Sequence, residues 1–349
     1  VLGTLMAVQP SVAQLDGADM KSEAAYQTRQ AFWIALALGV PYWFICYYSE
    51  PLLVAFRIDP SIVPDAAGYL RAISWGAPGL CLVLLLRYFS EGTGNTKPTM
   101  FYGVAGVLLN IPLNYVLMFG KLGFPALGTV GCGYATSIVI WLQFLFLLVY
   151  IATHRHYRPF SLLSRLEMPH MKTIISLLKL GLPIAVAIAV EGSLFVGAAL
   201  LIGQLGPVPA AAHLIAINFA ALMFMIPVGL SSAISIRVGN ALGRGEPEAA
   251  RYAGRIGLLI VFLFQTVSAI AMFLFPELIV RIYTDDVAVG TLAVSLLFYA
   301  AIFQYPDGVQ MVMAGALRGY KDTRMPMVYT IVAFWIVGMT LGYTLTFNR

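Results

Sequence analysis

The sequence predicts an all-α polytopic membrane protein, and three observations carry this prediction. Hydrophobic residues make up 60% of the 349 residues, and charged residues only 11%. A soluble domain carries about 25% charged residues. The apolar residues fall in nearly uncharged runs of about 20 residues, the length of a helix that crosses a bilayer. Lys and Arg concentrate in alternate connections between these runs, as in multi-pass membrane proteins.

We predict nine complete spans and one partial span. In order, they cover residues 1–13 (partial), 31–49, 66–89, 99–119, 128–152, 176–203, 209–235, 254–275, 288–314 and 326–347. Fourteen Lys and Arg lie in the connections on one side, among them loops 14–30, 154–172 and 237–253, and only Arg57, Lys121 and Arg281 lie on the other. The positive-inside rule places the richer side in the cytoplasm. The net charge of +5 therefore sets orientation, and we expect no nucleic-acid partner.

A weak internal repeat divides the chain. EGTGNTKPTM, from Glu91, aligns with RGYKDTRMPM, from Arg318, 227 positions later. The repeat holds six spans, an even number, which predicts two six-helix lobes in parallel orientation. We expect twelve helices in the intact protein, with the first and last outside this chain. The predicted parts are an N-terminal lobe (1–153), a cytoplasmic inter-lobe loop (154–172) and a C-terminal lobe (173–349).

Glu191 stands near the middle of the apolar run GLPIAVAIAVEGSLFVGAALLIG, Gly181–Gly203. A carboxylate at the bilayer midplane costs roughly 2.5–3.5 kcal/mol on insertion scales. Ala187 and Phe195, one turn before and after, supply a small site and an aromatic face that suit a lipophilic cation. One interpretation is an acid that is neutral and only packs helices together. Cation binding is favoured, because intramembrane acids are usually functional.

Asp307 is the second intramembrane acid, and it follows Pro306. Proline removes a backbone donor and frees the carbonyl one turn earlier, near Ile302, so a broken helix here could build a Na⁺ cage or an H⁺ relay. The i, i+3, i+4 spacing predicts one shared face for Phe303, Asp307, Gln310, Met311 and Ala314. The alternative is a proline kink with a helix-capping Asp.

Asn110 and Asn114 lie one turn apart around Pro112. Asn is costly in lipid, so this pair should face the interior of the bundle. Hydrogen bonding between helices and lining of a polar cavity are weighed evenly for these two side chains.

Four segments resemble the multidrug and toxic compound extrusion (MATE) family, NorM branch. They are SEGTGNTKPTM (Ser90–Met100), LLNIPLNYVLMFGKLGFPALGTVGCGYATS (Leu108–Ser137), MIPVGLSSAISIRVGNALGRG (Met225–Gly245) and YPDGVQMVMAGALRGYKDT (Tyr305–Thr323). The resemblance implies a V-shaped, monomeric bundle in the lipid of a bacterial inner membrane. It also implies export of cationic, amphipathic drugs and dyes in exchange for Na⁺ or H⁺, with no further cofactor.

For the site, the resemblance implies that Glu191 and Asp307 bind the coupling cation, with Na⁺ as a candidate ligand, or the drug. We expect Phe195, Phe303, Gln310 and Met311 to complete this site, and Asn110 and Asn114 to line a polar cavity of the first lobe. Some family members carry Tyr where Phe303 stands, and Phe offers no oxygen ligand, so the coupling ion stays open between Na⁺ and H⁺.

The sequence favours export over two other functions. A lipid-linked saccharide flippase of the same superfamily would need several cationic side chains for pyrophosphate, whereas these spans carry chiefly Arg71, Arg87 and Lys179. A membrane-embedded enzyme would need a polar catalytic cluster, and the sequence offers none. Since the sequence also has no ATP-binding motif, we expect an ion gradient to drive transport.

Overall fold

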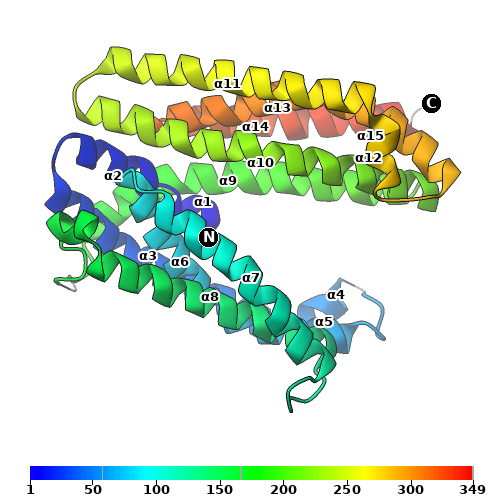
Figure 1. The fold of residues 1–349 in the computed structure, drawn as a ribbon, viewed down its shortest axis with the longest axis horizontal. Helices are drawn as coiled ribbons and strands as arrows, with labels where there is room; N and C mark the ends of the chain where they lie inside the picture. The colour runs from blue at the N-terminus through cyan, green and yellow to red at the C-terminus, as the bar shows by residue number, and fades with distance from the viewer. Residues whose placement is uncertain (57, 166, 348–349) are drawn as a thin grey trace. The chain divides into compact units, whose positions relative to one another are not determined.

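The computed structural model describes residues 1–56, 58–165 and 167–347 (Figure 1). Arg57, used above for orientation, lies outside the described residues. The chain forms two compact units, Val1–Gly181 and Leu182–Arg349. The boundary between them falls inside one long helix, α9, and each unit is described by itself.

The first unit is built from helices alone over its described residues. They are α1 (Leu2–Leu5), α2 (Val8–Gly17), α3 (Lys21–Tyr47), α4 (Glu50–Ala55), α5 (Val63–Ser74), α6 (Ala77–Gly92), α7 (Lys97–Phe119), α8 (Gly128–Thr153), the 3₁₀ helix η1 (Arg155–Phe160) and the start of α9 (Met171–Gly203). Its apolar core lies between α3, α6 and α8 and includes Phe89, which contacts Tyr157 and Phe160 of η1.

The second unit continues with helices to its last described residue. They are the rest of α9, α10 (Pro207–Gly243), α11 (Pro247–Leu274), α12 (Pro276–Arg281), α13 (Val287–Gly319), α14 (Arg324–Thr330), the π-helix η2 (Ile331–Met339) and α15 (Thr340–Phe347). Figure 1 shows α10, α11 and α13 side by side, and each of the three contacts the other two.

The all-α prediction is confirmed. Among the described residues, 8 helices are long and apolar enough to cross a membrane, or 9 when the bent pair α5–α6 counts as one span. These match the nine complete spans predicted, and the partial first span is α1 and α2. The run α14–η2–α15 forms the last span.

The bend between α5 and α6 is a feature that the sequence analysis missed. The two helices meet at 47° inside the predicted span 66–89. At the bend, a Cβ on Gly76 would lie 3.1 Å from Ser137 of α8, tighter than most side-chain contacts. The Ser137 hydroxyl donates a hydrogen bond to the Ala72 carbonyl at 2.9 Å. Ala72 lies in the last turn of α5, where the carbonyl oxygens have no hydrogen-bond donor within the helix.

The repeat predicted from sequence reappears in the helix boundaries. Corresponding ends in the two units lie 227 positions apart for three pairs: Tyr47 and Leu274, Gly92 and Gly319, and Lys97 and Arg324. From α3 to α7 and from α11 to α14, the two units therefore repeat the same order of helices.

Two predicted loops are largely helical, which corrects the sequence analysis. The region 14–30 holds the end of α2 and the start of α3, and 237–253 holds the ends of α10 and α11 with only Arg244–Glu246 between them. Hydropathy marks the apolar part of a helix and not its end, since polar residues continue the helix. In the short connection between α10 and α11, Gly245 has a φ of +75°, and Pro247 begins α11.

Candidate functional site

The two intramembrane acids lie on different helices of the second unit, Glu191 on α9 and Asp307 on α13. The α-helix α13 runs without a break through Pro306, so the expectation of a broken helix was wrong. Asp307 lies inside this helix and therefore does not cap it.

Glu191 lines a small cavity of about 50 Å³. Its walls come from α9, α13, and α14 with the residue that precedes it: Ile184, Ala187, Ile188, Gln310, Met311, Ala314, Arg318, Thr323, Pro326 and Thr330. A cavity needs only about 10–15 Å³ to hold one water, so this one has room for a few waters or a small ion and not for a drug. The structure places Gln310 and Met311 in the same cavity as Glu191.

Arg318 is a functional candidate that the sequence analysis placed among the loop residues. It lies in the last turn of α13 with only 7% of its surface exposed. Its guanidinium donates to the Ser231 hydroxyl at 2.6 Å, and that hydroxyl donates to the Met311 carbonyl at 2.6 Å. Arg318 thus stands on the wall of the Glu191 cavity as a tethered positive charge that attracts the carboxylate.

Asp307 lines a second, larger cavity of about 290 Å³. Its other lining residues are Phe195, Ile217, Ala220, Ala221, Phe224, Gln265, Phe303 and Gln304. A carboxylate beside aromatic rings is the chemistry that binds an amphipathic organic cation, through charge and through cation–π contacts. Its volume is close to the lower end of small-molecule sites, about 300–1,000 Å³.

A reciprocal pair of amides holds α11 against α13 at this cavity. The Gln265 amide donates to the Gln304 carbonyl at 2.9 Å, and the Gln304 amide donates to the Gln265 carbonyl at 3.2 Å. Ser268 donates to Gln304 Oε1 at 2.9 Å. Gln265 Oε1 is buried and, within the described part of the chain, has no hydrogen-bond partner. The pair presents polar atoms beside Asp307 and was absent from the predicted site.

The structure divides the predicted face of α13 between the two cavities. Phe303 and Asp307 line the larger one, whereas Gln310, Met311 and Ala314 line the smaller one. Phe195 likewise lies with Asp307 although it is one turn from Glu191 on α9. Helical spacing places these residues on one face of their helix. The neighbouring helices determine which residues of that face line each cavity.

Asn110 and Asn114 lie on α7 in the first unit. The Asn114 amide donates to Asn110 Oδ1 at 2.6 Å, so the bond runs along one helix and not between helices. Asn114 Oδ1 is buried and has no hydrogen-bond partner among the residues that the structure describes.

Known proteins resemble this chain in both sequence and fold. The MatE family model matches residues 1–116 and 183–344. A probable multidrug resistance protein NorM of Xanthomonas axonopodis pv. citri is 46% identical over 341 residues, which is 98% of this chain and 74% of the relative.

The chain belongs to the MATE family. The multidrug resistance protein PmpM of Pseudomonas aeruginosa is 42% identical, over 98% of the MATE chain and 72% of PmpM. A crystal structure of MATE in the straight conformation aligns with a TM-score of 0.90 at 20% identity, over 100% of this chain and 77% of that one. An outward-facing MATE transporter of the MOP superfamily gives a TM-score of 0.89, also at 20% identity, over 98% and 76% of the two chains. The resemblance expected from sequence and the MATE fold are confirmed, and a transporter family rules out the membrane-embedded enzyme.

Proposed function

We propose that this MATE chain acts in multidrug efflux across a bacterial inner membrane, as a monomer that exchanges cationic, amphipathic drugs for Na⁺ or H⁺. Relatives that cover nearly the whole chain are named multidrug resistance proteins, which supports export of organic compounds. The observation that carries the proposal is a pair of intramembrane carboxylates in two cavities of one unit. Placing an acid inside a membrane costs free energy, so an acid that is kept there usually serves a function.

The sizes of the cavities suggest that the two acids differ in role. The Glu191 cavity of about 50 Å³ suits the coupling ion, with Gln310 as a polar neighbour. The Asp307 cavity of about 290 Å³, with Phe195 and Phe303 on its walls, suits the organic cation. The two carboxylates also interact electrostatically. A cation bound at one carboxylate therefore weakens the attraction of the other carboxylate for a second cation. Exchange then follows from this negative coupling between the sites.

Arg318 strengthens the argument for exchange. Its charge occupies the Glu191 cavity wall permanently, held by Ser231. With Arg318 in place, loss of the bound ion does not leave Glu191 as an isolated buried charge, which would be strongly unfavourable. The empty state is therefore accessible, as a transport cycle requires.

A vesicle assay tests the proposed function. The transporter, expressed at its natural length, is reconstituted in proteoliposomes that contain ethidium. We expect an imposed gradient of Na⁺ or of H⁺ to drive dye movement against its concentration gradient, and the driving ion to identify the coupling ion. If neither gradient drives the dye while binding is intact, the antiporter proposal is wrong.

Two basic side chains that a flippase site would need are engaged elsewhere. Arg87 pairs with Glu91 at 2.8 Å, and Arg71 lies 3.8 Å from Glu50. The pair of Arg87 with Glu91 engages one of the few basic side chains of the spans, which favours drug efflux over the lipid-linked saccharide reaction. In the first unit we propose that Asn110 and Asn114 line a polar cavity, with Asn114 Oδ1 open to a donor.

A further inference from the structure

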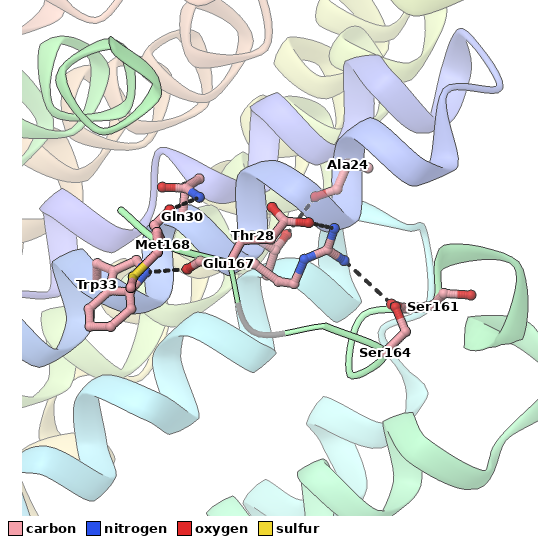
Figure 2. A network of polar contacts seen from close by, with 9 residues as sticks. Ala24, Thr28, Gln30, Trp33, Ser161, Ser164, Glu167 and Met168 are labelled. Carbon is pink, nitrogen blue, oxygen red and sulfur yellow. Dashed lines mark hydrogen bonds and ion pairs between the residues drawn. The ribbon is translucent and has the colours of Figure 1, made fainter. Parts of the chain in front are cut away.

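The segment that follows η1 is held against α3 by a series of polar contacts (Figure 2). Arg29 pairs with Glu167 at 2.7 Å and also donates to the Ser161 carbonyl at 3.4 Å. The Trp33 indole donates to the Glu167 carbonyl at 2.9 Å, and Gln30 donates to the Met168 carbonyl at 3.0 Å. These contacts hold Ser161, Glu167 and Met168 against α3.

Beneath this segment lies a cavity of about 200 Å³ in the first unit. Its floor consists of apolar side chains from α3, α6, α8 and the segment itself: Phe32, Leu82, Leu85, Leu86, Phe144, Leu148, Leu162 and Leu163. Its other lining residues are Thr28, Arg29, Trp33, Arg165 and Glu167. The cavity therefore combines an apolar lining with charged side chains, as an amphipathic ligand requires.

These charged side chains select the sign of the ligand. The carboxylate of Glu167 is neutralised by Arg29. Arg165 is exposed, and within the described ranges it makes no ion pair. The surrounding segment adds Arg155, Arg158 and Lys172. An organic cation would be repelled here, so this cavity does not duplicate the Asp307 cavity.

We propose that this cavity binds an anionic phospholipid, with an acyl chain on the apolar floor and the phosphate at Arg165. Basic pockets between transmembrane helices at the cytoplasmic side are typical sites for anionic lipid head groups. The predicted orientation puts the segment that follows η1 on that side. The lipid would lie against the segment that follows η1 and would stabilise its position on α3.

Trp33 provides a local reporter of the acyl chain, because it lines the cavity. The protein is reconstituted in phosphatidylcholine vesicles with increasing small fractions of phosphatidylglycerol brominated on its acyl chains, which quench nearby indoles. The Trp33 signal is the difference between the natural protein and Trp33→Phe. We expect this signal to be quenched with saturation at a low fraction of brominated phosphatidylglycerol, and brominated phosphatidylcholine at the same fractions to quench much less.

Arg165→Gln tests the head-group contact, and Arg155→Gln is its matched control, since Arg155 is an exposed arginine of the same region that does not line the cavity. One arginine near a membrane surface contributes about 1 kcal/mol to anionic lipid binding, so Arg165→Gln should raise the half-saturating fraction about fivefold. Arg155→Gln should leave it within about twofold. Equal, unsaturated quenching by both lipids would mean bulk lipid contact only, and equal effects of both variants would mean a general surface potential. Either result would overturn the proposal.

Discussion

At the residue scale, the two carboxylates have different neighbours. Asp307 shares a cavity of about 290 Å³ with Phe195, Phe224 and Phe303, whereas Glu191 shares one of about 50 Å³ with Arg318. Cation–π attraction is worth about 0.5–2 kcal/mol, and the carboxylate adds a direct charge interaction. Organic cations should therefore depend on the first group of residues more than on the second.

Dye titrations should separate these groups. Asp307→Asn and Phe303→Ala should weaken ethidium binding in detergent about 3- to 30-fold, because each removes an attraction for the cation. Glu191→Gln should weaken it less than Asp307→Asn. Phe298→Ala on the same helix is a matched control, since that ring stacks on Phe273 outside the cavity, and it should leave the dissociation constant unchanged. Equal losses for Glu191→Gln and Asp307→Asn would contradict the division of roles.

At the element scale, α13 is fixed by small residues that admit its neighbours. A Cβ on Gly315 would overlap the Ser231 carbonyl oxygen of α10, and a Cβ on Gly308 would overlap the Gln265 amide of α11. Such close approach lets Ser231 reach both Arg318 and Met311, and lets Gln265 and Gln304 bond reciprocally. Close contacts between helices and polar contacts at both cavities thus come from the same glycines.

Gly315→Ala should destabilise the protein by about 1–3 kcal/mol, because the added methyl group pushes α10 and α13 apart. Gly229→Ala on α10 is the matched control. A Cβ there meets nothing within 4 Å, and alanine favours a helix, so stability should be unchanged or higher. Thermal unfolding in detergent measures both variants. Equal stability of Gly315→Ala and the natural protein would show that this contact is looser than described.

The sequence predicted elements better than it predicted their contacts. Apolar runs located all nine complete spans, and the spacing from Glu91 to Arg318 located the repeat to the residue. The repeat aligns the acid Glu91 with the base Arg318, and hydropathy places Arg318 in a loop between two predicted spans. Its burial depends on Ser231, 87 positions away, which no local pattern reveals. The pairing of Gln265 with Gln304 was invisible for the same reason.

Prediction of the site was also limited, because contacts between distant residues cannot be read from a local pattern. Charge in an apolar run singled out Glu191 and Asp307, because an intramembrane acid is unusual in any sequence. Helical spacing then grouped Phe303 with Gln310, which line different cavities. Which side chains share a cavity depends on where α9, α11 and α14 meet α13, and that requires the tertiary structure.

At the scale of the whole molecule, orientation in the membrane is a prediction from charge alone. A cysteine-free background requires replacement of Cys46, Cys81 and Cys132. In that background Leu122→Cys, in the exposed turn after α7, should react with a membrane-impermeant maleimide on intact cells. Ser164→Cys should react only after permeabilisation. The reverse pattern would invert the orientation and would also move the proposed lipid site to the outer leaflet.

The measurement that bears most directly on the account is gradient-driven ethidium efflux, normalised to protein in the membrane, for Glu191→Gln and Asp307→Asn at natural length. Both changes remove a charge with little change in volume, so both variants should insert in the membrane. Asp307→Asn should unfold like the natural protein, whereas Glu191→Gln takes the carboxylate away from the buried Arg318 and should be less stable, so efflux is compared per folded molecule. Each should nevertheless lose efflux, because a group that no longer distinguishes the bound from the empty state cannot couple ion and drug. Normal efflux per molecule in both variants, or loss explained by reduced stability, would show that the two acids only pack the helices together.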